Sequence, residues 1–286
     1  MNIDVEKMKS GQREIDNMIQ TLADSKKDTA VKSGVTKDRL GDYDPVADGA
    51  FDFEKYAKSD TKIMFVGREP NSPGDGGWDF KEVPINNESF FGLMNGAANG
   101  ILNNDCAPMK NTVFVNISNF SGKAGPQGTM AELYNENKEI FEKKVSVYRP
   151  DVVVCHNTAE LCWPSLQKEL GFNNYTAKYF DRHGDEIPLD QNNQPVEKAA
   201  VAAYYCDNGK TIIDTSYPAA QHDISQADWI NGVVNAHKNN PNKNNQKNIE
   251  KRKKRCIIPT GGGAAKSILI VAGIVLLISI LLAVLV

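Results

Sequence analysis

The chain has 286 residues and a formal net charge of −3, a small value that hides an uneven distribution of charge. Residues 1–240 carry 25 Lys and Arg against 35 Asp and Glu, a net charge of −10, whereas residues 241–286 carry 8 against 1, a net charge of +7. A protein that grips DNA mainly through its phosphates is expected to be basic, so the acidic larger part argues against that class.

The cysteines and the first residues exclude further classes of protein. The five cysteines are odd in number, form no Cys-x-x-Cys pair and lie at no zinc-ligand spacing from a histidine, so neither a disulfide framework nor a metal site is expected. Reduced cytosolic thiols are the simplest interpretation. The stretch Met1 to Lys27 is rich in charge, and it therefore does not resemble a signal peptide.

Residues 1–60 are predicted to form a helical and irregular N-terminal segment. Apolar residues recur at helical spacing between Ile3 and Leu22 and predict an amphipathic helix that is broken near Ser10-Gly11. The residues that follow, to about Asp60, are polar and are predicted to be loop.

Residues 61–238 alternate apolar, strand-like runs with helical patterns. The expected strands are Lys62–Gly67, Thr112–Ser118, Asp151–His156 and Thr211–Thr215, and the expected helices are Ser89–Leu102, Thr129–Val147, Thr158–Leu170 and Ser225–Ala236. Apolar strands separated by helices are typical of a mainly parallel sheet that is covered on both faces. The sequence therefore predicts one α/β domain, a three-layer sandwich with a mainly parallel central sheet.

Two parts of this domain fall outside the alternation. Val201–Tyr205 and the turn Asp207-Asn208-Gly209 precede the last strand and predict a hairpin. Residues 180–197 show neither strand nor helix periodicity, and we interpret them as an insertion.

The C-terminal residues predict a membrane anchor on a flexible linker. Residues 239–266 are polar and include the basic cluster Lys251–Arg255, which favours the cytosolic side and anionic lipid headgroups. Ser267–Val286 contains no charged side chain, and as a helix it would be about 30 Å long, the thickness of the hydrocarbon core. We expect a single-pass, tail-anchored membrane protein with its domain in the cytoplasm; a buried C-terminal helix is the alternative.

Polar residues follow each of the four expected parallel strands. Ligands of parallel α/β proteins bind beyond the carboxyl ends of the strands, so these residues are candidates for one shared site. In chain order they are Gly67-Arg68-Glu69-Pro70-Asn71, Asn116-Ile117-Ser118-Asn119, His156-Asn157-Thr158 and the loop from Ser216 to His222. Each also has a structural alternative, namely a tight turn, a partner for loop backbone groups or a helix cap.

The order of these motifs resembles the uracil-DNA glycosylase superfamily. The resemblance covers Lys62 to His222 and rests on the segments KIMFVGREPN, ESFFGLMNGAANGIL, NTVFVNISNFSG, RPDVVVCHNTAEL and DTSYPAA. The individual motifs are short, so their order and spacing carry the resemblance. It implies a uracil-DNA glycosylase-like fold and an enzyme that hydrolyses the bond between a base and its sugar.

The resemblance also implies roles for single residues. Glu69 takes the place of the family's water-activating Asp, Phe90 stacks on an extruded base, and Asn116 pairs with the base edge. Tyr217 stands where the family has a histidine, and its phenol donates a hydrogen bond to the leaving base but supplies no cation. The further substrate-binding candidates are Gly67, Arg68, Pro70 and His222.

Some of these assignments have structural alternatives: Phe90 as a core aromatic and His222 as a surface histidine. The iron–sulfur cysteines of one branch of the superfamily are absent from the sequence, and no cofactor or metal is expected.

Two functions follow from these observations. The first is a membrane-tethered N-glycosylase whose partner is nucleic acid. The second is a module of the same fold that binds or senses a nucleotide at the membrane, without DNA repair activity, which the acidic charge favours. An inactive scaffold remains a third interpretation if Glu69 and Asn116 do not face a common site. The sequence predicts no oligomeric state.

Overall fold

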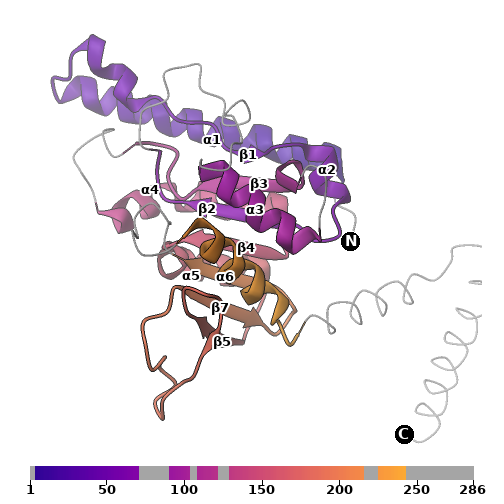
Figure 1. The fold of residues 1–286 in the computed structure, drawn as a ribbon. Helices are drawn as coiled ribbons and strands as arrows, with labels where there is room; N and C mark the ends of the chain where they lie inside the picture. Colours follow the sequence, from indigo (N-terminus) through magenta and orange to yellow (C-terminus); the bar gives the residue numbers. More distant parts are fainter. Residues whose placement is uncertain (1–3, 71–89, 104–107, 122–128, 216–224, 243–286) are drawn as a thin grey trace, which may run out of the picture. The chain divides into compact units, whose positions relative to one another are not determined.

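The computed structural model describes residues 4–70, 90–103, 108–121, 129–215 and 225–242. In this part of the chain a mixed sheet of eight strands lies between helices, which confirms the predicted α/β class (Figure 1). The strands are β1 (Gly49–Ala50), β2 (Ile63–Gly67), β3 (Thr112–Asn116), β4 (Val152–His156), β5 (Tyr175–Phe180), β6 (Glu186–Ile187), β7 (Val201–Cys206) and β8 (Thr211–Thr215). The α-helices are α1 (Val5–Lys32), α2 (Phe53–Lys58), α3 (Phe90–Leu102), α4 (Met130–Tyr148), α5 (Ala159–Leu170) and α6 (Gln226–Lys238), and η1 (Lys37–Tyr43) and η3 (Pro108–Asn111) are short 3₁₀ helices.

The sheet is parallel only at its centre. Its strand order is β1-β3-β2-β4-β8-β7-β5-β6, and β2 pairs in parallel with β3 and β4, as β4 does with β8. The other four pairings, β1 with β3 and those among β8, β7, β5 and β6, are antiparallel. The prediction of a mainly parallel sheet is therefore wrong for the sheet as a whole. Short turns, such as the predicted one between β7 and β8, allow only antiparallel pairing.

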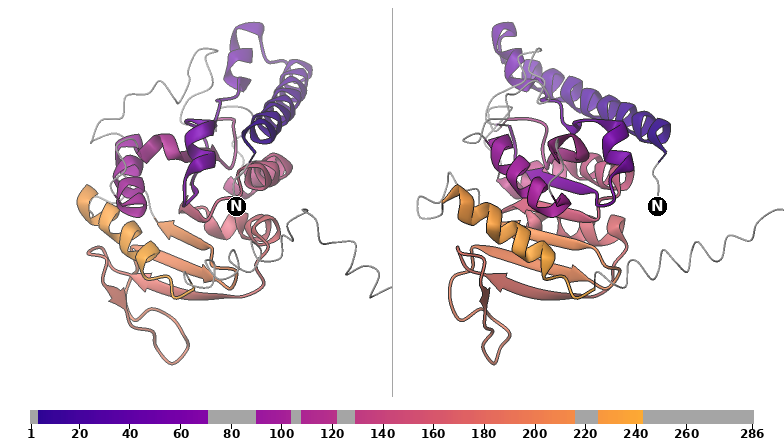
Figure 2. Two further views of the ribbon diagram at one scale, coloured as in Figure 1. Left: turned by 90° about the vertical axis from the view of Figure 1, so that its right-hand side faces the viewer. Right: turned by 45° about the vertical axis from the view of Figure 1, so that its right-hand side comes forward.

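Helices cover both faces of the sheet (Figure 2). The helices α3 and α6 pack on one face, with Phe91, Met94 and Trp229 in a core that includes Phe65 of β2 and Val154 of β4. The helices α4 and α5 cover the opposite face, where their own apolar side chains enclose those that point the other way from the same strands. The strands β2, β3 and β4 are buried at every position because both faces of the sheet are covered there.

The N-terminal helix is continuous, so the predicted break near Ser10-Gly11 is wrong. The helix α1 runs from Val5 to Lys32 and packs along α4. A Cβ atom on Gly11 would lie 2.5 Å from a methyl group of Val147 in α4, so this glycine permits the close approach of two helices. The residues up to Asp60, predicted to be loop, contain η1, β1 and α2.

The segment 180–197, predicted to lack regular structure, begins at the end of a strand. The strand β5 pairs with β7 and with the short strand β6, and Leu189 and Pro195 form a further antiparallel bridge. The segment is therefore a β-arm at the edge of the sheet, next to the predicted hairpin of β7 and β8, which is confirmed.

The chain divides into two compact units, Met1–Gln246 and Lys247–Val286. Among the residues that the structure describes, no helix is both long and apolar enough to span a membrane. The predicted anchor, Ser267–Val286, lies outside the described residues.

Candidate functional site

The four central strands end in one row of residues. In strand order β3, β2, β4, β8 these are Asn116, Gly67, His156 and Thr215, since Asn116 is opposite Gly67, His156 is opposite Thr215, and β2 pairs with β4. Alternate residues of a strand point to opposite faces, so the four share a face with the residues two positions earlier. That face is the one covered by α3 and α6, because its core contains Phe114, Phe65, Val154 and Ile213.

This row lies where the connections between strands change sides. From β2 the chain passes through α3 on one face to β3, and from β3 it passes through α4 on the other face to β4, which lies beyond β2. In open α/β sheets ligands bind beyond the carboxyl ends of the strands at such a switch point. The ends of β2 and β4, and the loops after them, are therefore the expected place for a site.

Gly67 and Asn116 fit together at the end of β2 and β3. A Cβ atom on Gly67 would lie 2.5 Å from Oδ1 of Asn116 and 3.1 Å from the ring of Phe114. No side chain larger than hydrogen fits there unless Asn116 moves. The glycine of the predicted first strand-end motif thus provides the space in which the amide of the second motif lies.

The loop after β2 carries Glu69 past the same edge. The amide N–H of Ile117 donates to the carbonyl of Gly67 and that of Ser118 to the carbonyl of Arg68, both at 3.1 Å, so the two strand ends continue side by side. Oε2 of Glu69 is buried and accepts no hydrogen bond from the described residues; Nε of Arg68 lies 3.7 Å from it. A carboxylate oxygen in this state can accept a hydrogen bond from a water molecule.

A buried ion pair lies next to Asn116 on its other side. Nζ of Lys144, in α4, lies 2.6 Å from Oδ2 of Asp48, 2.7 Å from Oδ1 of Asn119 and 3.2 Å from the carbonyl oxygen of Asn116. The same Asp48 oxygen accepts the backbone N–H of Asn116 at 2.9 Å. Burial lowers the pKa of Lys144, and the charge of Asp48 opposes this lowering. Neither Lys144 nor Asp48 was identified as a candidate from the sequence.

His156, at the end of β4, is a buried aromatic of the same row. Its ring stacks on Trp229 of α6, with centroids 5.8 Å apart and planes 10° apart, and burial lowers its pKa to about 4. The imidazole is therefore neutral near neutral pH. The predicted alternative, a helix cap, is met only in part. Thr158 occupies the N-cap position of α5, but its side chain makes no cap hydrogen bond. Oδ1 of Asp214 accepts the N–H of Thr158 and of Ala159 instead.

The structure places some predicted site residues and not others. It brings Gly67, Arg68, Glu69 and Asn116 to one edge of the sheet, with Pro70 directly after them. The backbone of Phe90 begins α3, and its side chain is outside the description. Tyr217 and His222 lie outside the described residues.

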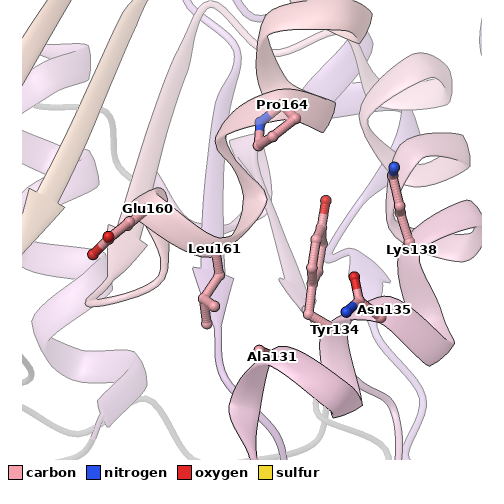
Figure 3. A pocket seen from close by; sticks show the side chains of 7 residues that line it. All are labelled: Ala131, Tyr134, Asn135, Lys138, Glu160, Leu161 and Pro164. Atoms are coloured by element: carbon pink, nitrogen blue, oxygen red, sulfur yellow. The ribbon is translucent and has the colours of Figure 1, made fainter.

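A separate cavity of about 490 Å³ opens between α4 and α5, on the face opposite to Asn116 (Figure 3). The figure shows two helices contributing its walls, which are formed by Ala131, Tyr134, Asn135, Lys138, Glu160, Leu161 and Pro164. Within the described ranges, no three His, Cys, Asp or Glu side chains are placed to hold a metal ion.

Comparison of the chain with family models and with curated proteins gave no match. The geometry of the strand ends is therefore the basis for a functional proposal.

Proposed function

We propose that the chain is a membrane-tethered N-glycosylase that hydrolyses the bond between a sugar and uracil, or a modified base, in nucleic acid. The observation that carries the proposal is the fit of Asn116 over Gly67 at the switch point of the sheet, with Glu69 two residues further along the same edge. An amide in a fixed position at that edge suits the recognition of a base, which presents both donors and acceptors.

The proposed reaction needs one carboxylate and one hydrogen-bond donor. Glu69 accepts a proton from a water molecule whose oxygen bonds to C1′ of the sugar, while the bond from C1′ to the base breaks with its electron pair leaving on the base. The carboxylate also stabilises the positive charge that develops on the sugar. Tyr217 donates a hydrogen bond to the departing base, and Phe90 stacks on it.

The first test is release of free base from oligonucleotides that contain uracil or another modified base. Glu69→Gln is expected to lower the rate by about 10²–10⁴-fold, because the amide keeps the shape of the side chain but cannot take the proton. Binding of the oligonucleotide is expected to persist. If the unaltered protein releases no base from any of these substrates, the enzymatic proposal is wrong.

Recognition is tested by two further variants in the same assay. Asn116→Asp replaces a donor with a second acceptor and is expected to weaken base recognition. Gly67→Ala places a Cβ atom 2.5 Å from Oδ1 of Asn116 and is expected to lower kcat/KM by about 10- to 100-fold, because a shift of about 1 Å in a positioned group is that costly. Gly41→Ala is the matched control, since its Cβ would lie 3.8 Å from the nearest neighbouring atom, Oδ2 of Asp44.

The charge of the chain favours a second candidate. Residues 1–240 have a net charge of −10, which opposes nucleic-acid binding through phosphates and suits a module that binds or senses a free nucleotide at the membrane. This candidate predicts nucleotide binding without base release, and loss of that binding in Gly67→Ala. Salt dependence separates the two further, because affinity for a strand falls steeply with salt concentration.

The proposed membrane attachment rests on the sequence of Ser267–Val286 and on the basic cluster Lys251–Arg255. It places the domain in the cytoplasm, at the surface of a membrane, and it makes anionic lipid a partner of the cluster.

A further inference from the structure

The ion pair of Lys144 and Asp48 is enclosed by the protein. Each side chain is only 1% exposed, and three short contacts use the three N–H groups of the ammonium. Lys144 therefore binds two pieces of chain that are distant in sequence: the residue before β1, and the stretch from the last residue of β3 to Asn119 in the loop that follows.

The pair supplies the hydrogen-bond partners that a neighbouring strand would otherwise give to the main chain of Asn116. The strand β1 pairs with β3 only through Gly49 and Ala50 and begins opposite Phe114, two residues before the end of β3. Beyond that point Oδ2 of Asp48 accepts the N–H of Asn116, and Nζ of Lys144 donates to its carbonyl. Both main-chain groups of Asn116 are thus held by charged partners, whose hydrogen bonds are stronger than those between neutral groups.

Asn119, three residues after Asn116, is hydrogen-bonded to the segment that contains Asp48. The side-chain amide of Asn119 donates to the carbonyl of Val46 at 2.9 Å, the N–H of Val46 donates to the carbonyl of Asn119 at 2.9 Å, and Oδ1 of Asn119 accepts from Lys144. The short loop that starts at Asn116 is therefore bound at both of its ends.

We infer that Lys144 and Asp48 are the positioning pair for Asn116, fixing the main chain of this residue so that its amide stays over Gly67 in the orientation that reads a base. This role in base reading rests on the proposed function, and so does any test of it by enzyme activity. A buried ion pair adds little to stability compared with apolar side chains of similar size, because both charges lose their hydration. Its place beside the recognition residue therefore accounts for it better than stability does.

The test uses the full-length protein and the double variant Asp48→Leu/Lys144→Met. Removing both charges leaves no unpaired buried ion, so the double variant is expected to fold. Either single apolar variant would leave one buried charge without its partner and would destabilise the protein strongly. Asp48→Asn keeps an acceptor for the N–H of Asn116 but leaves the buried Lys144 ammonium without its counter-ion, so it is expected to be less stable than the double variant. Lys143→Met is the control on the neighbouring residue of α4, whose ion pair with Glu14 lies far out on the surface.

Two readouts separate this inference from the proposed function. The first is amide hydrogen exchange without ligand: the N–H of Asn116 should exchange at least about tenfold faster in the double variant, while that of Val154 in β4 stays unchanged. The second is base release, where kcat/KM for the preferred base should fall by about 10²-fold and discrimination against other bases should weaken. If no base is released by any variant, exchange at Asn116 still decides the positioning role.

The inference is overturned if the double variant leaves the exchange of Asn116 unchanged. It is also overturned if all core amides accelerate together, since the pair would then support the whole fold rather than this residue. Unaltered base discrimination in a variant with faster exchange would likewise contradict it.

Discussion

Asn116 is held on three sides by residues from distant parts of the chain. Gly67 leaves the space in which its side-chain oxygen lies, and Asp48 and Lys144 bind its main-chain N–H and C=O. Residues that share a partner in this way are expected to give non-additive effects when they are changed together. Because Gly67, Asp48 and Lys144 all act on the position of one amide, variants that combine changes at these residues should cost little more activity than the worst single one.

His156 carries a prediction about pH and stability. Its pKa is about 4 in the folded protein, against about 6.5 for an unperturbed histidine, because burial disfavours the charged imidazole. Below about pH 6.5 the unfolded chain takes up a proton that the folded chain does not, so the free energy of unfolding falls as the pH falls. The loss develops between about pH 6.5 and about pH 4 and amounts to about 3 kcal/mol at most.

The measurement is urea unfolding at several pH values, compared with His156→Phe. Phenylalanine keeps a flat ring against Trp229 but does not titrate, so the variant should lose this part of the slope while all other groups contribute equally to both proteins. Identical slopes in the two proteins would show that His156 is charged in the folded state at low pH.

At the scale of elements, the contact of α1 with α4 depends on Gly11. A Cβ atom there would lie 2.5 Å from a methyl group of Val147, whose short branched side chain cannot turn away. Gly11→Ala is therefore expected to destabilise the protein by about 1–3 kcal/mol, although alanine favours a helix by about 1 kcal/mol. In a Val147→Ala background both methyl contacts disappear and only a Cβ–Cβ contact of 3.3 Å remains, so the same change should cost clearly less. Thermal unfolding of the four proteins of this cycle measures the difference, and a loss of equal size in both backgrounds would contradict the proposed contact.

The central elements could be predicted because their sequences depend on one local pattern. The runs that form β2, β3, β4 and β8 have apolar centres and are buried at almost every position, as in strands covered on both faces, and the structure ends each within two residues of the prediction. The break predicted at Gly11 was wrong because a glycine that admits a neighbouring helix looks the same in a sequence as one that ends a helix. The strand β5 was missed because its exposed residues, from Tyr175 onward, show no buried pattern.

The candidate site likewise contains residues that the sequence predicted and residues that it missed. Gly67 and Asn116 were predicted because they stand at the ends of recognisable strands. Asp48 gave no signal, since it lies in a polar stretch and its partners are 68 and 96 residues away. Lys144 did give a signal in the sequence. It lies on the buried stripe of α4 between Phe141 and Tyr148, where a charged residue requires a buried partner.

At the scale of the whole molecule, charge is arranged along the chain in a way that suits a membrane surface. The acidic residues 1–240 and the basic residues 241–286 have opposite net charges, −10 and +7. Near an anionic membrane the first part is repelled and the second attracted, so the domain is expected to stand away from the lipid while the cluster Lys251–Arg255 approaches it.

The last prediction separates the two ways in which the C-terminal residues can hold the protein at a membrane. Each Lys or Arg near an anionic surface contributes about 1 kcal/mol, so the five residues of Lys251–Arg255 give a reversible attachment that high salt releases. An uncharged helix of the length of Ser267–Val286 inserts in a way that salt does not reverse. We therefore expect the full-length protein to stay in the membrane fraction after a high-salt wash. Deletion of residues 264–286 should move the protein to the soluble fraction, and its circular dichroism spectrum should show that the α/β domain is still folded. Replacing the five basic residues by Gln should leave the protein salt-resistant. Release of the full-length protein by salt alone would mean that the basic cluster, and not the apolar segment, holds it there.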